Sequence, residues 1–301
     1  MSNEGLKELL EFADDIKSVL EKKYQKVEVN QVIKNNDEML VAVTVRDESA
    51  VAPNIYLNGF YKDFVDNKAT VDEISVQIQR IVDESKENDS IKSIDLDIFA
   101  DKTELKDRVF IKLVGTENNE KYLKDAYKVD VADGLVAVFY IMVCEDDNGF
   151  MSTKLSKDMY EILDMPLQEL YEVARRNTEE IMPARITTML DVLGSLAPND
   201  VIEDEIPLYV ATNIKSVNGA TVVLYEGVLK DFCIKHDISE LYIIPSSVCE
   251  VLILPKTEST SLEYLLEMVQ EVNSTVLEDR DFLSNHVYEY NVDGDKITLA
   301  L

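Results

Sequence analysis

Short segments that alternate apolar and polar residues constrain this fold more than any other feature of the sequence. They occur at 27–34 and 39–47, and again around the Asp-Gly dipeptides at 133–134 and 293–294. Alternation with a period of two is typical of strands with one buried face, and Asp-Gly dipeptides favour tight turns between paired strands. The stretch YIIPSSVCEVLILP at 242–255 has the form of another strand pair. The sequence therefore predicts antiparallel hairpins rather than a parallel sheet.

Stripes of apolar residues three and four positions apart predict amphipathic helices between these strands. The stripes cover 5–23, 155–163, 167–174 and 262–269. Two residue pairs with the spacing of a capping box predict where helices begin: Thr70 with Glu73, and Thr260 with Glu263. Because helices and hairpins occupy separate stretches, we expect an α+β fold with mainly antiparallel sheets flanked by helices, in two halves.

The acidic segment EDDNGF at 145–150 is the clearest linker signal in the chain. We therefore expect an N-terminal α+β half at 1–150 and a C-terminal α+β half at 151–301. Segments 59–64 and 227–232 share the pattern G-x-x-K-D-F, which marks either a duplicated half-domain or a coincidence. We favour coincidence because the flanking sequence does not extend the match, and repeats require sustained similarity.

The composition is that of a protein that folds without disulfides or structural metals. The chain has 301 residues, of which 46% are hydrophobic, and this is enough for a large core. Its three cysteines are scattered and form no C-x-x-C pair, which fits reduced thiols in a cytosol. The N-terminal stretch is acidic, unlike a secretory signal, and apolar runs such as 135–143 are too short to cross a bilayer. We predict a cytoplasmic protein without membrane association.

The net charge of −29, from 59 acidic and 30 basic residues, bears on the choice of partner. Such a charge repels phosphate backbones, so we predict no direct binding to nucleic acid. Two interpretations of the acidity remain. The simpler one is solubility, which we favour, and the other is mimicry of a nucleic acid in the groove of a basic partner.

The segment around 242–255 holds the most enzyme-like residues of the chain. Ser246, Ser247 or Cys249 could act as a nucleophile if a base lay within hydrogen-bond reach, and His286 is the candidate base. The stretch lacks the G-x-S-x-G pattern of a nucleophile elbow, however. A turn whose backbone groups are satisfied by the serine hydroxyls is the simpler interpretation.

Patterns for metals and cofactors are missing. The chain has only two histidines and neither an H-E-x-x-H motif nor a glycine-rich phosphate loop. Residues 144–155 have the length of a calcium-binding loop, but Cys144 and Leu155 stand where carboxylates are needed. We predict no metal and no cofactor.

Four aromatic residues, Tyr56, Phe60, Tyr61 and Phe64, cluster where an extended segment is expected to lead into a helix. Aromatic side chains at such a junction could anchor a partner peptide. The alternative, which we favour, is that they belong to the core.

Several longer strings resemble one known family. They are PNIYLNGFYKDF at 53–64, YEGVLKDF at 225–232, the stretch at 242–255, EMVQEVNST at 267–275 and LSNHVYEY at 283–290. In these strings the chain is similar to bacterial proteins catalogued as domain of unknown function fifty-six eighty-eight. The resemblance implies a bacterial, intracellular accessory protein and brings no established activity or ligand. In that family a histidine is common where this chain has Cys249, which argues against a cysteine nucleophile.

The aromatic cluster and the resembling strings together give the candidate binding residues. These are Tyr56, Gly59, Phe60, Tyr61, Pro245 and Glu250. Our leading hypothesis is a non-enzymatic, acidic, cytoplasmic protein that acts through contacts with an unknown protein partner. The alternatives are a hydrolase that uses Ser246, Ser247 or Cys249 with His286, and an acidic nucleic-acid mimic that inhibits a basic partner.

Overall fold

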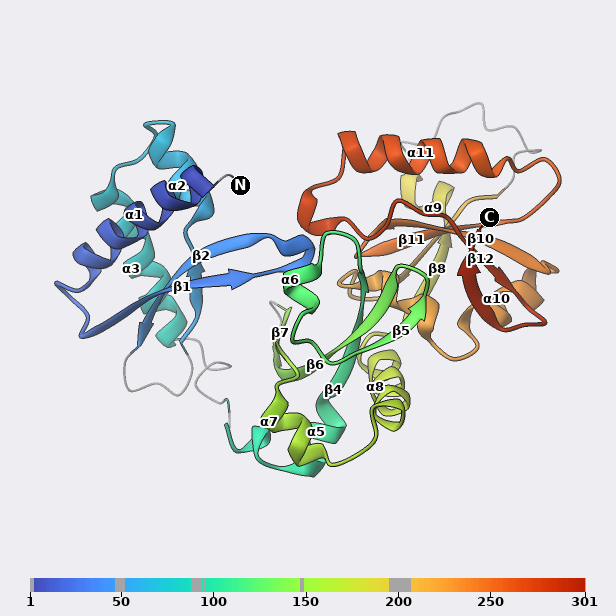
Figure 1. Ribbon diagram of the computed structural model, residues 1–301, viewed down its shortest axis with the longest axis horizontal. Helices are drawn as coiled ribbons and strands as arrows, with labels where there is room; N and C mark the ends of the chain where they lie inside the picture. Colours follow the sequence, from blue (N-terminus) through green and yellow to red (C-terminus); the bar gives the residue numbers. More distant parts are fainter. Residues whose placement is uncertain are drawn as a thin grey trace. The chain divides into compact units, whose positions relative to one another are not determined.

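The computed structural model describes residues 3–46, 52–87, 94, 96–146, 149–194 and 207–300 (Figure 1). It confirms the expected α+β fold, in which the sheets are antiparallel and are accompanied by helices. The chain divides into two compact units. Unit 1 comprises Met1–Phe99 and Val143–Ser152, and unit 2 comprises Ala100–Met142 and Thr153–Leu301. Within the described residues, no helix is both long and apolar enough to cross a membrane.

The two units divide the chain differently from the predicted halves at 1–150 and 151–301, because β4 (Val109–Gly115) packs within unit 2. The backbone N–H groups of Ile111 and Leu113 donate to the hydroxyl oxygens of Thr178 and Thr221, at 3.0 Å in both cases. These bonds join residues far apart in the sequence, so a local linker signal does not reveal them. The predicted linker covers the end of one strand and the start of the next, and residues 147–148 within it lie outside the described residues.

Unit 1 packs helices on one face of a three-stranded antiparallel sheet. Its elements are α1 (Asn3–Leu20), β1 (Lys26–Ile33), η1 (Asn35–Asp37), β2 (Met39–Arg46), β3 (Asn54–Tyr56), α2 (Asn58–Val65), α3 (Val71–Glu87) and η2 (Leu96–Phe99). The sheet has the order β1-β2-β3, as the alternating segments predicted for its first two strands. Val41, Val43 and Val45 of β2 pack on the apolar stripes of α1 and α3.

The capping box at the start of α3 is confirmed. The Thr70 N–H group donates to the Glu73 carboxylate at 2.9 Å, and the Glu73 N–H group donates to the Thr70 hydroxyl at 3.3 Å. Helix α2 follows β3, where the sequence predicted that an extended segment leads into a helix. Asn58 accepts a hydrogen bond from the Val41 N–H group and donates one to the Met39 carbonyl. Gly59, expected near the end of an extended piece, therefore lies inside a helix.

Unit 2 contains the six-stranded antiparallel sheet and most of a four-stranded one, of which the end of β6 and the start of β7, within Val143–Ser152, belong to unit 1. The four-stranded sheet has the order β4-β6-β5, and β7 also pairs with β6. The six-stranded sheet has the order β13-β12-β10-β11-β9-β8. The strands after β4 are β5 (Lys128–Ala132), β6 (Leu135–Asp146), β7 (Gly149–Lys154), β8 (Ala184–Thr188), β9 (Tyr209–Asn213), β10 (Glu240–Ser247), β11 (Glu250–Pro255), β12 (Tyr288–Asn291) and β13 (Lys296–Leu299). The three predicted hairpins, β5–β6, β10–β11 and β12–β13, are confirmed.

Helices cover both faces of the six-stranded sheet. The helical elements of unit 2 are α5 (Lys102–Arg108), α6 (Glu120–Leu123), α7 (Lys157–Leu163), α8 (Leu167–Ile181), α9 (Met189–Leu193), η4 (Gly219–Leu224), α10 (Val228–His236), α11 (Leu262–Thr275) and η5 (Asp279–Asp281). Leu241 and Ile243 of β10 pack toward η4 and α10, in a core that β4 and β6 share. The alternate residues, Tyr242 and Ile244, pack under α11.

The residue that caps α11 differs by one position from the predicted one. The capping side chain is Ser261 rather than Thr260, and its hydroxyl oxygen accepts a hydrogen bond from the Tyr264 N–H group at 3.3 Å. Thr260 instead interacts with Thr257 through its hydroxyl at 2.9 Å. Both residues suit an N-cap, so only the direction of the incoming chain decides between them.

Candidate functional site

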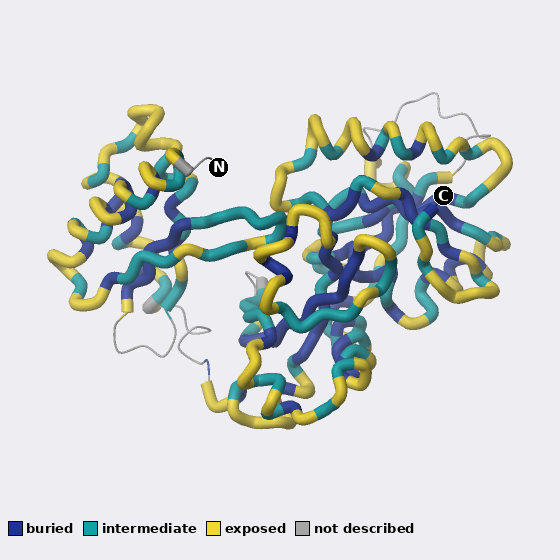
Figure 2. The backbone as a smooth tube through the Cα atoms, in the orientation of Figure 1, coloured by how far each residue is buried: buried dark blue, intermediate teal, exposed yellow. Residues whose placement is uncertain are grey.

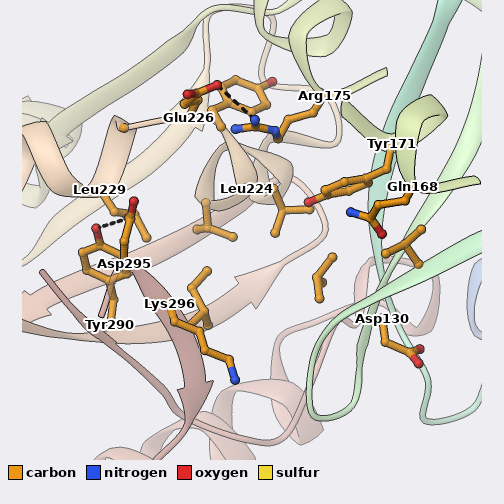
Figure 3. Close-up of a pocket in the computed structure, with 16 residues that line it drawn as sticks. Asp130, Gln168, Tyr171, Arg175, Leu224, Glu226, Leu229, Tyr290, Asp295 and Lys296 are labelled. Carbon is orange, nitrogen blue, oxygen red and sulfur yellow. Dashed lines mark hydrogen bonds and ion pairs between the residues drawn. The ribbon is translucent and has the colours of Figure 1, made fainter. Parts of the chain in front are cut away.

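Two strands that each end a sheet, β5 and β13, border a common groove in unit 2. A pocket of about 460 Å³ and another of about 390 Å³ lie along them and share Asp130, Val131, Lys296 and Ile297. We call the two pockets together the β5–β13 groove. Figure 3 shows the larger pocket.

The free edge of β13 turns backbone groups away from its sheet. The Ala300 N–H group donates to the Val287 carbonyl, next to the paired residues of β12. In an antiparallel pair, hydrogen-bonded and non-hydrogen-bonded positions alternate. The backbone N–H and C=O groups of Ile297 and Leu299 therefore point away from β12, and no other strand in the described part of the chain pairs with β13.

The same reasoning applies to β5 on the other side of the groove. The Phe139 N–H group of β6 donates to the Tyr127 carbonyl, one residue before β5 begins. Alternation then turns the backbone groups of Asp130 away from β6. Asp130 lines both pockets, so the groove has a strand edge on each side.

The floor of the larger pocket is apolar. Leu229 belongs to the main core of unit 2, and Val131, Leu224 and Ile297 pack against that core while remaining partly exposed. An apolar floor beside strand edges can take side chains of an added segment that point inward.

The rim of the larger pocket carries charges of both signs. The Arg175 guanidinium lies 2.7 Å from the Glu172 carboxylate and 3.0 Å from the Glu226 carboxylate. Desolvation disfavours the charged guanidinium, but the two carboxylates outweigh it and raise the pKa of Arg175. In the part of the chain that the structure describes, the Lys296 ammonium group forms no ion pair. Figure 3 shows Arg175 and Lys296 on opposite sides of the pocket, with the Tyr171 hydroxyl directed toward its middle.

A hydrogen bond within the β12–β13 hairpin stiffens one wall. The buried Tyr290 donates to the Asp295 carboxylate at 2.6 Å across the turn. Burial is the main cause that raises the pKa of Tyr290, and the Asp295 charge adds to it. The phenol therefore stays a hydrogen-bond donor at neutral pH. Its bond to Asp295 fixes the turn that leads into β13, the strand that carries Lys296.

The groove residues were missed at the sequence level. Asp130 precedes one predicted Asp-Gly turn, and Lys296 follows the other. For each of them the sequence pattern predicts only a place in a hairpin. No sequence signal shows that the two hairpins face one another, because that depends on the packing of both sheets on one core.

The serines and the cysteine of the predicted catalytic set lie at the β10–β11 hairpin. The Ser247 hydroxyl oxygen accepts a hydrogen bond from the Cys249 N–H group at 3.1 Å, as expected for a serine that satisfies a turn. Burial raises the pKa of the Cys249 thiol, although a hydrogen bond from the Asn218 backbone partly offsets it. A nucleophilic cysteine requires the opposite shift. Ser246 is half-buried near the end of β10.

The predicted base, His286, contacts residues outside the predicted catalytic set. Its side chain is exposed, and its backbone N–H group donates to the Ser284 hydroxyl at 3.1 Å. The Cδ2 atom of its ring lies about 4 Å from where a Cβ atom on Gly134, in the β5–β6 turn, would stand. Among the residues described, no hydrogen bond joins His286 to Ser246, Ser247 or Cys249.

Four of the candidate binding residues lie in unit 1. The Tyr61 ring packs at a tilt against Phe12 with ring centroids 5.4 Å apart, and its hydroxyl donates to Glu8 at 3.1 Å. Phe60 packs partly against the unit 1 core. Gly59 lies in α2 with open space around it. Phe64, the fourth aromatic of the cluster, is 37% exposed and stacks on Phe12.

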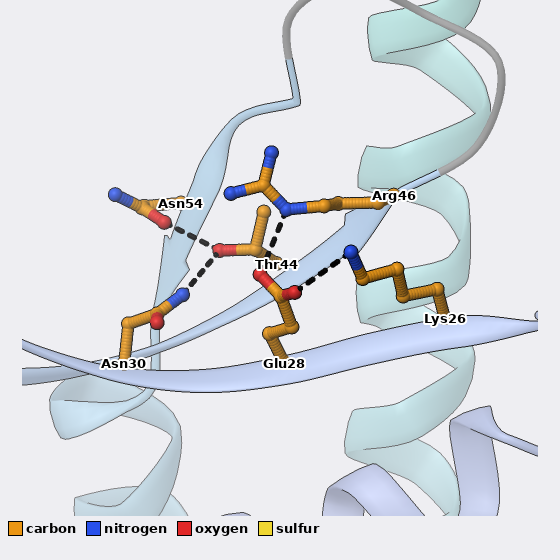
Figure 4. A network of polar contacts seen from close by, with 6 residues as sticks. All are labelled: Lys26, Glu28, Asn30, Thr44, Arg46 and Asn54. Atoms are coloured by element: carbon orange, nitrogen blue, oxygen red, sulfur yellow. Dashed lines mark hydrogen bonds and ion pairs between the residues drawn. The ribbon is translucent and has the colours of Figure 1, made fainter.

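Tyr56 lies in β3, in the same sheet as a network of polar side chains. The half-buried Tyr56 ring has the Lys34 ammonium group 5.1 Å from its centroid. Figure 4 shows the network, in which Thr44 donates to Asn54 at 2.5 Å and accepts from Asn30 at 3.0 Å. These hydrogen bonds join side chains of β1, β2 and β3, so the network stabilises the sheet.

Glu28, beside these residues, completes the network. Its carboxylate lies 2.7 Å from Arg46 and 3.2 Å from Lys26. The hydrogen bond from Arg46, followed by that from Lys26, lowers the pKa of Glu28. The charges on this part of the sheet therefore compensate one another locally.

The other two candidate binding residues lie in unit 2, at the hairpin of β10 and β11. Pro245 is buried, and Glu250 is half-buried and pairs with Ser247 in the register of the two strands. Neither lines the β5–β13 groove. In the described residues, no group of three or more His, Cys, Asp or Glu side chains is placed to hold a metal ion.

Comparison with known proteins gives one family. A family model described as a family of unknown function, DUF5688, matches residues 9–292, which is almost the whole chain. No curated protein and no solved structure matches the chain.

Proposed function

The chain belongs to the family of unknown function DUF5688, and we propose that it is a non-enzymatic interaction protein that binds an extended segment of a partner protein in the β5–β13 groove. The observation that carries this proposal is the pair of free strand edges on the two sides of one groove. An extended segment added to such an edge pairs its backbone with the strand and places alternate side chains in pockets.

The rest of the groove supports a peptide better than a small cofactor. Its apolar floor suits inward-pointing side chains, whereas its rim offers Asp130 and Glu226 as well as Arg175 and Lys296. A rim of mixed sign matches the alternating charges of a polypeptide more closely than a single phosphate. The net charge of −29 further favours a partner that carries positive charge outside the groove.

The bacterial cytoplasm is the location that we infer for this activity. The three cysteines, Cys144, Cys233 and Cys249, are free thiols. Free thiols in a folded protein are typical of a reducing compartment. The hydrolase and the nucleic-acid mimic stay as predictions, and no contact described above favours either of them.

The proposal is tested by selecting peptides from a library of displayed random segments on the immobilised full chain. A selected peptide, labelled with fluorescein, is then titrated with the wild type and with Thr298→Trp, which puts a bulky side chain at a residue that lines the smaller pocket. We expect the affinity to fall at least about tenfold, since a bulky group in a binding pocket removes a central contact.

Two controls accompany this measurement. Thr298→Ser changes the same position without filling the groove, and Thr187→Trp adds a tryptophan on β8, the opposite edge of the same sheet. Both should bind as the wild type does. The proposal fails if no peptide is enriched, or if selected peptides bind Thr298→Trp as tightly as the wild type.

A further inference from the structure

Strand β1 is an outer strand of the three-stranded sheet in unit 1, and its edge is long and regular. All 8 of its residues pair with β2 in one continuous register, and the strand contains neither proline nor glycine. The opposite outer strand, β3, has only 3 residues. Figure 2 shows β1 as exposed or intermediate along most of its length. A long, regular edge is a template for pairing with another chain, and most proteins shorten or interrupt such edges.

Several residues of β1 turn their backbone groups away from the sheet. On β2, the Val41 carbonyl accepts from the Leu57 N–H group at 2.7 Å, and the Val41 N–H group donates to Asn58 at 3.0 Å. Both groups of Val41 thus point away from β1, so Gln31, which lies opposite Val41, turns its own N–H and C=O groups outward. By alternation, the other residues with this orientation are Val27, Val29 and Ile33. In the described part of the chain, none of these outward groups forms a hydrogen bond.

The outward groups of β4, another long outer strand, do have partners. Strand β4 lies at the edge of its sheet and has 7 residues. Threonine hydroxyls accept hydrogen bonds from the N–H groups of Ile111 and Leu113, and the Asn177 amide donates to the Val109 carbonyl at 2.8 Å. Within the described residues, the chain therefore closes the β4 edge with its own side chains and leaves the β1 edge open.

The charges along β1 differ from those of the chain as a whole. The chain has 59 acidic and 30 basic residues, whereas the segment from Lys26 to Lys34 holds two lysines and one glutamate, Glu28. Lys34 continues the strand with an extended backbone, is exposed and, among the residues described, forms no ion pair. Because Glu28 and Lys34 are an even number of positions apart, they lie on the same face of the sheet.

We propose that β1 pairs in antiparallel orientation with β1 of a second copy of the chain, so that two three-stranded sheets join into one. Gln31 would lie on the symmetry axis, opposite Gln31 of the second copy, and Val29 would lie opposite Ile33. These pairs would form about six backbone hydrogen bonds from groups that are otherwise free. Glu28 would lie opposite Lys34 of the second copy, and the symmetry repeats this contact.

The charges favour this register over its neighbours. With Asn30 on the axis, Lys26 would lie opposite Lys34, and with Glu28 on the axis two carboxylates would meet. Like charges directly opposite one another are destabilising. With Val27 on the axis, Lys26 would lie opposite Glu28, but the pairing would use only the first residues of the strand. A strand from another protein would meet the same backbone groups, whereas the match of Glu28 with Lys34 is a property of the chain paired with itself.

The test is sedimentation equilibrium of the full chain, loaded at about 1 to about 300 µM, a range that covers weak and transient interfaces. The salt concentration is about 0.15 M, where a Debye length of about 8 Å screens distant charges of the two acidic chains. We expect a monomer–dimer equilibrium. A chain that stays monomeric over the whole range would overturn the proposal.

Gln31→Pro tests the strand edge. Proline lacks the N–H group, and it is tolerated in an outer strand where that group faces solvent. The monomer should therefore stay folded, as circular dichroism will show, while the dissociation constant of the dimer rises at least about tenfold because two central hydrogen bonds are lost. Gln31→Ala, which keeps the N–H group, is the matched control and should dimerise as the wild type does.

Lys34→Glu tests the register. It places two carboxylates opposite one another at both symmetric contacts, so the dissociation constant should again rise at least about tenfold. Lys62→Glu makes the same change of charge at an exposed position of α2 and should have a much smaller effect. Equal weakening by the two lysine variants would show that only net charge matters, and it would overturn this register.

An unchanged dimer in Gln31→Pro would overturn pairing through β1. The proposal does not depend on the β5–β13 groove. Thr298→Trp should dimerise as the wild type does, and Gln31→Pro should bind a peptide selected on the groove with unchanged affinity. The two surfaces can therefore fail or succeed independently.

Discussion

The hydroxyl group of Tyr288 donates a hydrogen bond of 2.9 Å to the backbone carbonyl of Asp133. Tyr288 is fully buried in β12, and Asp133 lies in the turn between β5 and β6. The same hydroxyl lies 3.1 Å from that of Ser284. This contact ties the two sheets together at one end of the β5–β13 groove, and it is one reason for which the groove keeps its width.

The substitution Tyr288→Phe should lower the free energy of unfolding by about 1–2 kcal/mol, because it leaves the Asp133 carbonyl without a buried donor. Urea unfolding followed by circular dichroism measures the change. Tyr242→Phe is the matched control, since Tyr242 is also buried and, in the described residues, its hydroxyl makes no hydrogen bond. Equal stability of the two variants would show that the Tyr288–Asp133 bond contributes nothing.

The two glycines of the shared G-x-x-K-D-F pattern should respond in opposite ways to alanine. Gly227 has a φ of +74°, in the left-handed region, so Gly227→Ala should cost about 1–2 kcal/mol. Gly59 lies within α2 with no atom within 4 Å of a new Cβ, so Gly59→Ala should be neutral or stabilise by up to about 1 kcal/mol. Thermal unfolding of both variants gives the comparison. Equal destabilisation would instead indicate that the segments are structural equivalents.

The cap of α11 gives a prediction that separates two neighbouring residues. Ser261→Ala should lower the free energy of unfolding by about 1 kcal/mol, because the Tyr264 N–H group loses its acceptor. Thr260→Ala should cost less, because Thr260 accepts no N–H group of the helix. Guanidinium unfolding of both variants measures the difference. A larger loss of unfolding free energy in Thr260→Ala than in Ser261→Ala would indicate that Thr260 caps the helix, as the sequence predicted.

The thiol of Cys249 should react slowly with iodoacetamide in the native protein. Burial raises the pKa of the Cys249 thiol in the native protein above its value in the unfolded chain. The contribution of this thiol to stability is therefore fully present below the unfolded pKa, and that contribution is lost as the pH rises through the native pKa. The alkylation rate at pH 8 should therefore be lower in the folded chain than in urea, and it should still be rising above pH 9.

Site-resolved mass spectrometry follows this reaction, and Cys233 serves as an internal reference. Burial raises the pKa of Cys233 to about 11, and its side chain is fully buried, so it should react still more slowly. Faster reaction of Cys249 in the folded chain than in urea would reveal an activated thiol. That result would strengthen the hydrolase hypothesis.

The parts of the fold that depend on neighbouring residues were predictable from the sequence. The turns at 133–134 and 293–294 and the Thr70–Glu73 box rest on dipeptides or on a spacing of three residues. The residue at which helix α2 begins was not predictable, because Asn58 bonds to a strand residue that lies 17 residues earlier in the chain. The choice of Thr260 over Ser261 failed because the capping-box spacing to Glu263 favours Thr260, whereas Ser261 caps the helix without such a box.

The groove could not be predicted, for a different reason. Asp130 and Lys296 become neighbours of one groove only after two sheets pack on a shared core, and hydrogen bonds such as the one between Tyr288 and Asp133 join the two hairpins. The sequence patterns of the two hairpins predict which strands pair within each hairpin. They do not predict what lies beside the unpaired edges of β5 and β13. The candidate binding residues from the aromatic cluster and the resembling strings therefore lie outside the groove.

The most direct test of the proposed function is amide hydrogen exchange at β13, with and without a saturating selected peptide. Pairing of the peptide with β13 predicts that the amides of Ile297 and Leu299, which face the groove, exchange at least about tenfold more slowly in the complex. The amide of Thr298, which faces β12, should change little. Unchanged exchange at Ile297 and Leu299 under full occupancy would contradict binding at this strand edge.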